Sequence, residues 1–206
     1  MLAKAPGALC VVLILLGGCT SSPAPPDESD YLQKVLAWRA DRDRNWSETT
    51  DPIPADRRAE FLPLKYFPPD PNYVVPAELR LAEERPVVEL PTSTGELRRM
   101  QIVGTLEFTL NGQKMSLGAL SPAGEPIRSL FVPFADLTTK NETYEAGRYL
   151  DIDPTATGLY TIDFNYAYNP TCAYNKAYSC PYPPKSNQLQ VPIRAGEKAP
   201  GAKKES

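Results

Sequence analysis

The chain has 206 residues, with 22 lysines and arginines, 25 aspartates and glutamates, and no histidine. Its hydrophobic fraction of 42% is enough to build a core, which excludes a wholly disordered protein. A net charge of −3 offers no basic surface, so we expect no nucleic-acid partner. Without histidine, Ser-His-Asp and Cys-His catalysis and histidine-ligated zinc or haem are excluded. We therefore predict no metal and no cofactor.

The N-terminal segment has the pattern of a lipoprotein precursor. A lysine precedes a short apolar run, which is well below the roughly 20 residues that span a bilayer. The run ends in Leu16-Gly17-Gly18-Cys19, which resembles a bacterial lipobox. We therefore predict a signal peptide over residues 1–18, a diacylated (palmitate-bearing) Cys19 and a proline-rich tether over residues 19–28. An ordinary signal peptide cleaved nearby is the alternative.

This signal sequence predicts a cell-envelope protein that is attached to the membrane, its first partner, through the lipid anchor. Thr20, not Asp, follows the cysteine, which indicates the periplasmic face of the outer membrane if the host has one. Only Cys172 and Cys180 then keep free thiols, because Cys10 leaves with the signal peptide and Cys19 is acylated. In an oxidising envelope a disulfide between them is expected, and their spacing matches no zinc signature.

Two helices are predicted at the start of the domain. Apolar residues recur at helical spacing from Tyr31 to Trp46, and Ser29 or Asp30 can cap the first turn. A second, short helix fits residues 55–62 and ends before Pro63.

Period-two patterns then favour β-strands. Residues 87–90 and 97–100 flank a hairpin loop, and residues 105–110 alternate cleanly before an Asn111-Gly112 turn and a return strand over 114–120. Further strands are predicted over residues 127–134, 148–152, 159–165 and 188–194. We expect a single mainly β domain over residues 29–198, an antiparallel β-sandwich or barrel-like fold, followed by a disordered tail over residues 199–206.

Residues 142–187 are unusual in composition, since they hold eight of the 11 tyrosines and several prolines. The stretches that carry a family resemblance are residues 104–108, 142–150, 163–174, 180–187 and 195–197. On these the chain resembles the bacterial and archaeal domain-of-unknown-function family 1684, over about residues 30–198. The resemblance implies no known activity, substrate or catalytic residue.

The same region is the candidate site. One interpretation is a pocket for a small polar ligand, a glycan or another envelope component. The residues that would line it are Glu142, Tyr144, Arg148, Asp163, Asn165, Tyr168, Asn169 and Asn187. The other interpretation is structural: Arg148 pairs with Asp163 or Glu142, the asparagines satisfy loop backbone, and the tyrosines pack.

Two further functions stay open. Glu142 and Asp163 could be a carboxylate pair for a hydrolase, although the sequence does not tell their separation. The tyrosine-rich loop or an exposed strand edge could instead dock an envelope protein. Among these we favour a lipid-anchored envelope protein that binds a ligand through residues 142–187.

Overall fold

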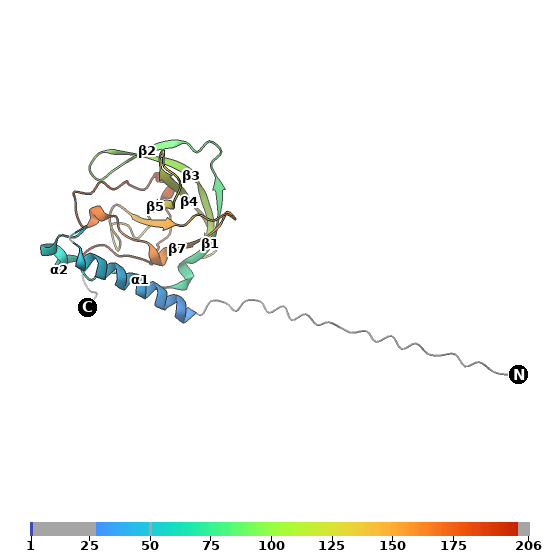
Figure 1. Ribbon diagram of the computed structural model, residues 1–206, viewed down its shortest axis with the longest axis horizontal. Helices are drawn as coiled ribbons and strands as arrows, with labels where there is room; N and C mark the ends of the chain where they lie inside the picture. Colours follow the sequence, from blue (N-terminus) through green and yellow to red (C-terminus); the bar gives the residue numbers. More distant parts are fainter. Residues whose placement is uncertain (2–27, 50, 202–206) are drawn as a thin grey trace.

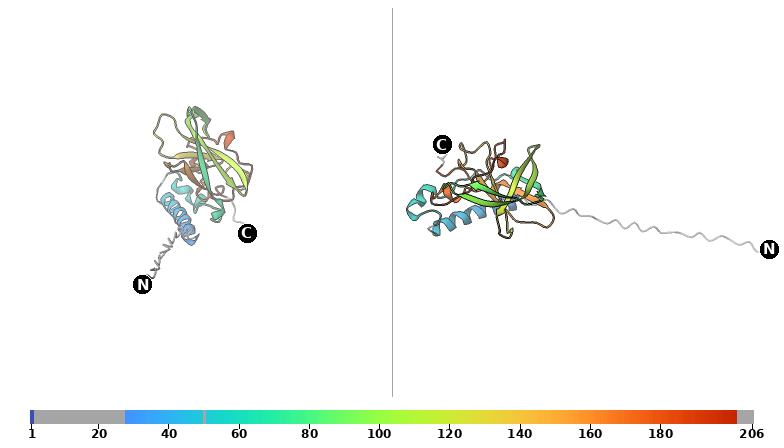
Figure 2. Two further views of the ribbon diagram at one scale, coloured as in Figure 1. Left: turned by 90° about the vertical axis from the view of Figure 1, so that its right-hand side faces the viewer. Right: turned by 90° about the horizontal axis from the view of Figure 1, so that it is seen from above.

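The computed structural model describes residues 28–49 and 51–201, together with Met1 (Figure 1). The predicted signal peptide, the lipidation site Cys19, the tether up to residue 27 and the last five residues of the predicted tail lie outside the described residues. The described domain is mainly β, with helices on one side of a curled sheet, as expected from the sequence (Figures 1 and 2).

Helix α1 spans Glu28–Glu48 and confirms the first predicted helix. Its buried side chains include Val35, which is fully covered, and Arg39, whose guanidinium donates to the carbonyl of Phe67 at 2.9 Å. Trp38 packs edge-to-face on Tyr166, with ring centroids 5.0 Å apart. The opposite face is highly charged, and no helix in the described part of the chain is both long and apolar enough to cross a membrane.

The second predicted helix is present as two short turns. A 3-10 turn, η1, spans Ala55–Arg57 and continues into α2, Arg58–Phe61. Leu62 is extended because it precedes Pro63, which disfavours helical backbone at the residue before it. Together with Ile53, Phe61 forms a small core around Tyr174.

Seven strands form one antiparallel sheet that curls into a half-barrel. They are β1 (Val74–Leu81), β2 (Val87–Pro91), β3 (Leu97–Leu110), β4 (Gln113–Pro122), β5 (Leu130–Phe134), β6 (Arg148–Ile152) and β7 (Leu159–Asp163). Their order is β6-β5-β4-β3-β1-β7, and β2 pairs with the first part of the long strand β3. The fold is therefore barrel-like, and the predicted antiparallel β class is confirmed.

The core lies on the concave side of this sheet. Leu106, Phe108 and Leu110 on β3 are buried, whereas Glu107 and Thr109 between them are exposed, which is the predicted alternation. The turn after β3 is also as predicted: Asn111 and Gly112 both have positive φ, of 50° and 76°.

Two strand predictions need correction, and one strand has no counterpart among the predictions. The last strand ends at Asp163, not Asn165, because the Asp163 carboxylate accepts the Asn165 N–H at 2.9 Å and turns the chain into the 3-10 turn η3, Phe164–Tyr166. Residues 188–194 form no strand; a single parallel bridge joins Gln188 to Ala135. Strand β1 was not among the predicted strands, since Pro76 interrupts its pattern.

Candidate functional site

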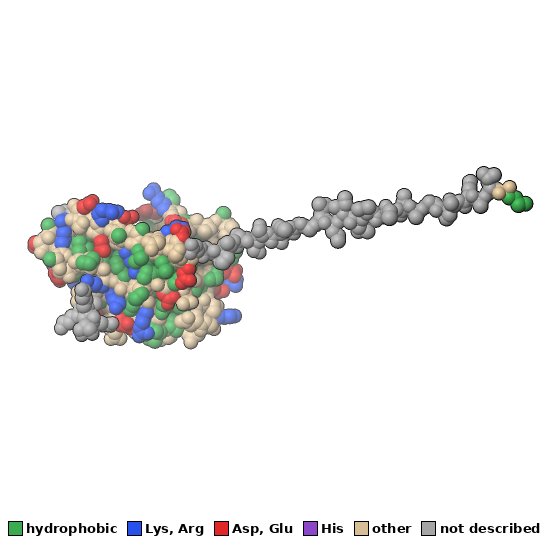
Figure 3. Space-filling view, turned by 90° about the horizontal axis from the view of Figure 1, so that it is seen from below, with side chains coloured by type: hydrophobic (Ala, Val, Ile, Leu, Met, Phe, Trp, Pro, Cys, Tyr) green, Lys and Arg blue, Asp and Glu red, His purple; other side chains and the backbone are tan. Residues whose placement is uncertain are grey.

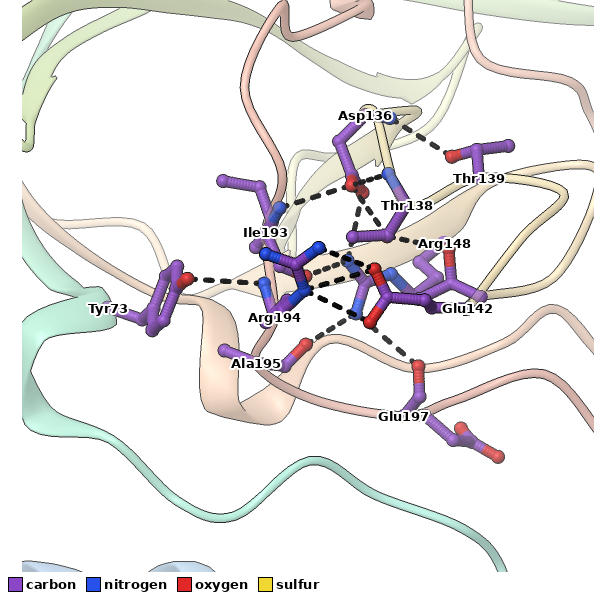
Figure 4. Close-up of polar contacts among 11 residues, drawn as sticks. Tyr73, Asp136, Thr138, Thr139, Glu142, Arg148, Ile193, Arg194, Ala195 and Glu197 are labelled. Carbon is purple, nitrogen blue, oxygen red and sulfur yellow. Dashed lines mark hydrogen bonds and ion pairs between the residues drawn. The ribbon is translucent and has the colours of Figure 1, made fainter. Parts of the chain in front are cut away.

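Arg148, the central residue of the predicted ligand site, lies in the protein interior with 1% of its surface exposed (Figure 4). Its guanidinium donates to Asp136 at 2.9 Å and to the carbonyl of Ile193 at 2.8 Å, and it also donates to the carbonyl of Ala195. The expected partners Asp163 and Glu142 are therefore replaced by Asp136 and the C-terminal segment. The role of Arg148 is to hold that segment against β6.

The Asp136 carboxylate also accepts several hydrogen bonds besides the one from Arg148. One carboxylate oxygen accepts the N–H and the hydroxyl of Thr138, at 2.7 and 2.6 Å, and the N–H of Ile193 at 3.1 Å. Burial lowers the pKa of Arg148, and the charge of Asp136 opposes that effect. Nothing in the sequence pattern marked Asp136 as the partner of Arg148.

Glu142 lies at the surface near this network and pairs with Arg194 (Figure 4). The arginine Nη2 and Nε atoms lie 2.9 and 3.0 Å from its carboxylate. Asp163, the second half of the predicted carboxylate pair, accepts the hydroxyl of Tyr31 on α1 at 2.8 Å. Each carboxylate is thus engaged by a different partner, an arginine for Glu142 and a tyrosine of α1 for Asp163.

The three predicted asparagines are fully buried and bind backbone. Asn187 bonds both the N–H and the carbonyl of Gly118, at 2.7 and 2.9 Å, and the carbonyl of Pro133. Asn165 accepts the N–H of Asp70 at 2.9 Å and donates back to its carbonyl at 2.8 Å. These contacts are those of the structural interpretation, in which asparagines satisfy the backbone of irregular loops.

Asn169 belongs to a second buried network, which centres on Glu197. The Asn169 N–H donates to Glu197 at 2.9 Å, and its amide donates to the hydroxyl of Tyr174 at 3.0 Å and to the carbonyl of Lys198 at 2.7 Å. Tyr174 donates its hydroxyl to the other Glu197 oxygen. Burial is the main cause that raises the pKa of Glu197 to about 7.

The structure describes Cys172 and Cys180 as free thiols, so it does not show the disulfide expected between them. They are nevertheless neighbours: the Cys172 N–H donates to the Cys180 sulfur at 3.1 Å. Tyr144, another predicted site residue, packs in the same small apolar cluster. The Nζ of Lys176 lies 3.4 Å from the Tyr144 hydroxyl.

Beside the cysteines the structure has a pocket of about 350 Å³. Its walls come from β3, β4, β5, β6 and the irregular segment 168–181. The side chains that line it are Arg98, Met100, Pro122, Ser129, Phe131, Tyr149, Asp151, Tyr168, Pro170, Thr171, Ser179, Cys180 and Pro181. Of the predicted ligand-binding residues, only Tyr168 is in this set.

Aromatic packing makes one wall of the pocket rigid. Tyr149 and Tyr168 pair through two backbone hydrogen bonds of 2.8 and 3.0 Å, and their rings meet edge-to-face. Phe131 packs on Tyr149 at 4.7 Å between centroids. The Tyr149 hydroxyl is turned away to the carbonyl of Pro181, at 2.6 Å. The Arg42 guanidinium of α1 lies 5.1 Å from the Tyr168 ring and supports it.

Polar groups occur at two places on the pocket wall. The Tyr168 hydroxyl donates to Asp151 at 2.5 Å, and burial followed by the charge of Asp151 raises the pKa of Tyr168. Arg98 donates to the carbonyl of Ser179 at 2.9 Å. Arg98 uses one guanidinium nitrogen in its bond to Ser179, and Asp151 accepts the Tyr168 hydroxyl through one of its two oxygens. Each side chain has further donor or acceptor atoms for a ligand.

The described residues contain no cluster of three or more cysteines, aspartates and glutamates placed to hold a metal ion. The face shown in Figure 3 carries acidic and basic side chains interspersed, without a field of one sign.

Comparisons with known proteins give a family and a fold. The model of the family described as "Protein of unknown function (DUF1684)" matches residues 59–198. The chain belongs to this family. An uncharacterised protein of Haloarcula marismortui, whose structure was solved in solution by NMR, is 40% identical. The match covers 82% of this chain and 95% of that one, with a TM-score of 0.66. No curated protein matches the chain.

Proposed function

We propose that this member of DUF1684 is a lipid-anchored envelope protein that binds a small amphipathic ligand in the pocket beside Tyr168. The pocket carries the proposal. At about 350 Å³ it falls within the size range of small-molecule sites, and most of its wall is apolar or aromatic. It also shares the segment 168–181 with the region that the sequence singled out.

The lining indicates the class of ligand. Met100, Phe131 and Tyr149 offer an apolar surface, which suits a ring or a short hydrocarbon chain. Arg98 and Asp151 offer one positive and one negative group beside it, which suits a ligand with a polar end. This is a narrower class than the small polar ligand expected from the sequence.

The anchor is proposed from the sequence alone. The lipobox-like Leu16-Gly17-Gly18-Cys19 would attach the chain to the membrane, and the polar stretch after Cys19 would separate it from the domain. Cys19→Ala should release the protein from the membrane fraction or leave the precursor unprocessed. A variant that stays with the membrane after processing would contradict lipidation of Cys19.

A thermal-shift measurement tests the pocket. The purified protein is screened against medium-chain fatty acids, aromatic carboxylic acids and aromatic amines. A ligand that binds only the folded state adds about 2.7 kcal/mol of stability at a hundredfold excess over its Kd. We expect at least one of these classes to raise the melting temperature reproducibly.

A filling substitution then locates the site. Ser129→Trp places an indole against the pocket wall and should abolish the shift. Ser47→Trp, on the exposed surface of α1, is the matched control and should retain it. A shift that survives Ser129→Trp would place the ligand elsewhere. No shift with any class would contradict this ligand assignment and favour an envelope protein as the partner.

A further inference from the structure

Two thiols at the pocket wall have no part in ligand binding as proposed above. Cys180 lines the pocket and has 5% of its surface exposed, whereas Cys172 lies behind it with 1% exposed. The Cys180 sulfur receives the N–H of Cys172 at 3.1 Å, and the hydroxyl of Thr171 lies 3.6 Å from it. Cys180 therefore belongs to the pocket wall, and Cys172 is its hydrogen-bonded neighbour outside the lining.

Hydrogen bonding between the two side chains shifts their pKa values in opposite directions. Hydrogen bonding from the Cys172 thiol is the main cause that lowers the pKa of Cys180 to about 6, and the charge of Arg98 acts in the same direction. The same hydrogen bond, followed by burial, raises the pKa of Cys172. These shifts favour the thiolate at Cys180, and Cys180 is the one of the two cysteines that lines the pocket.

We propose that Cys180 and Cys172 form a thiol–disulfide exchange site for a small disulfide that enters this pocket. Cys180 is the attacking sulfur and Cys172 is the resolving one. The proposal rests on the pocket of the proposed function and adds a reaction to it. The substrate class is an organic disulfide, R–S–S–R′, with apolar groups against Phe131 and Tyr149.

The exchange balances in two steps. The Cys180 thiolate attacks one sulfur of the substrate, a bond forms between Cys180 and RS, and the S–S bond breaks to release R′S⁻. The proton of Cys172 passes to the released R′S⁻. The Cys172 thiolate then attacks the Cys180 sulfur, which forms the Cys172–Cys180 disulfide and releases RS⁻, protonated by solvent. The protein dithiol is oxidised by two electrons, and the substrate disulfide is reduced to two thiols.

The alkylation of each cysteine can be measured separately in this chain. Lys176 lies between the two cysteines, so tryptic cleavage after it puts Cys172 and Cys180 on different peptides. The reduced full-length protein is treated with iodoacetamide for short times at pH 5 to 8, and each peptide is quantified by mass spectrometry. We expect Cys180 to be alkylated at least tenfold faster than Cys172 at pH 7, with its rate falling steeply below pH 6. Equal rates, or faster labelling of Cys172, would overturn the proposal.

Oxidised glutathione is the probe for exchange itself. In the wild-type protein we expect the two peptides to become joined by a disulfide, with two glutathione molecules released per chain. Cys172→Ser should stop after the first step and accumulate one glutathionyl group on Cys180. Cys180→Ser should accumulate none on Cys172. A mixed disulfide on Cys172 alone, or no reaction in folded wild-type protein, would contradict the assigned roles.

The two proposals fail separately. If amphiphiles stabilise both the wild-type protein and Cys180→Ser but glutathione does not react, the pocket binds and the exchange site is wrong. If glutathione reacts at Cys180 while no amphiphile binds, the thiol chemistry holds and the proposed ligand class is wrong. Arg98→Gln offers a test that leaves both sulfurs in place, and it should slow alkylation of Cys180 without changing that of Cys172.

Discussion

Tyr31 near the start of α1 donates its hydroxyl to both carboxylate oxygens of Asp163 at the end of β7, at 3.0 and 2.8 Å. The same hydroxyl accepts the amide of Asn165 at 2.8 Å. These contacts join residues 132 and 134 positions apart and dock the first turn of the helix on the last strand of the sheet. Burial, followed by hydrogen bonding to Asp163, raises the pKa of Tyr31.

Removing this hydroxyl should loosen the helix from the sheet. Tyr31→Phe is expected to lower the free energy of unfolding by about 1 kcal/mol, because a hydrogen bond to a charged group is lost at a partly exposed position. Urea denaturation measures it. Lys34→Met on the same helix removes only an exposed ion pair with Asp30 and should change the unfolding free energy much less. Equal effects in the two variants would argue against the docking role.

Breaking the interior ion pair between Arg148 and Asp136 should lower the stability of the fold strongly, and it should not act only on ligand binding. Arg148→Ala leaves Asp136 as an uncompensated buried charge and is expected to cost about 3–5 kcal/mol. Arg194→Ala breaks only the surface pair with Glu142 and should cost far less stability. Denaturant unfolding of the two variants measures both losses of stability. A stable, folded Arg148→Ala protein would contradict the assignment.

Glu197 predicts a stability that falls as the pH rises. Its pKa in the folded protein, about 7, lies above the ordinary value of 4.5, so the folded state binds more protons than the unfolded state between these values. The contribution of Glu197 to the free energy of unfolding should therefore be largest below pH 4.5. Between pH 4.5 and pH 7 this contribution should decrease by up to about 1.4 kcal/mol per pH unit.

Several charged groups act on the pKa of Glu197, and two glutamine variants test its titration. Arg42, at 3.8 Å, and Arg148 lower its pKa, whereas burial and Asp43 raise it. Glu197→Gln keeps the shape and removes the titration, so its unfolding free energy should depend less steeply on pH between 5 and 7. Glu142→Gln controls for the loss of one negative charge at the surface. Parallel pH profiles for wild type and Glu197→Gln would show that the group does not titrate in this range.

A pair of glycines tests how tightly the C-terminal segment is packed. Gly196 has a φ of +76°, and a methyl group there would lie 2.6 Å from the carbonyl oxygen of Ala167. Gly124 has a similar φ of +83° with open space around it. Gly124→Ala should cost about 1–2 kcal/mol through backbone strain alone, and Gly196→Ala should cost clearly more. Similar melting temperatures for the two variants would contradict this packing.

Much of the fold could be predicted because its signals are local. Helical spacing in α1, the alternation along β3 and the Asn111-Gly112 turn each depend on a few neighbouring residues, and the structure contains all three. The errors occur where a side chain competes with the sheet. Asp163 ends β7 because its carboxylate accepts the Asn165 N–H. The same carboxylate also accepts the hydroxyl of Tyr31, which lies at the other end of the chain.

The candidate site was less predictable for the same reason. Residue type alone placed Arg148 and Asn187 in a ligand pocket, whereas their partners, Asp136 and the Gly118 backbone, make them part of the interior. The pocket beside the cysteines is built from strands β3, β4, β5 and β6 and the segment 168–181. A single sequence carries no signal that joins Arg98 to Cys180 across 81 intervening positions.

The sequence by itself determined the family, the mainly β class with its N-terminal helices, and the lipobox-like pattern at Cys19. These follow from local pattern and composition. Only the tertiary structure decided which charged groups are buried in pairs and that Cys172 and Cys180 are neighbouring free thiols at the edge of a pocket. Such contacts depend on which distant segments the sheet brings together, because burial and hydrogen bonding are properties of that arrangement and not of any residue alone.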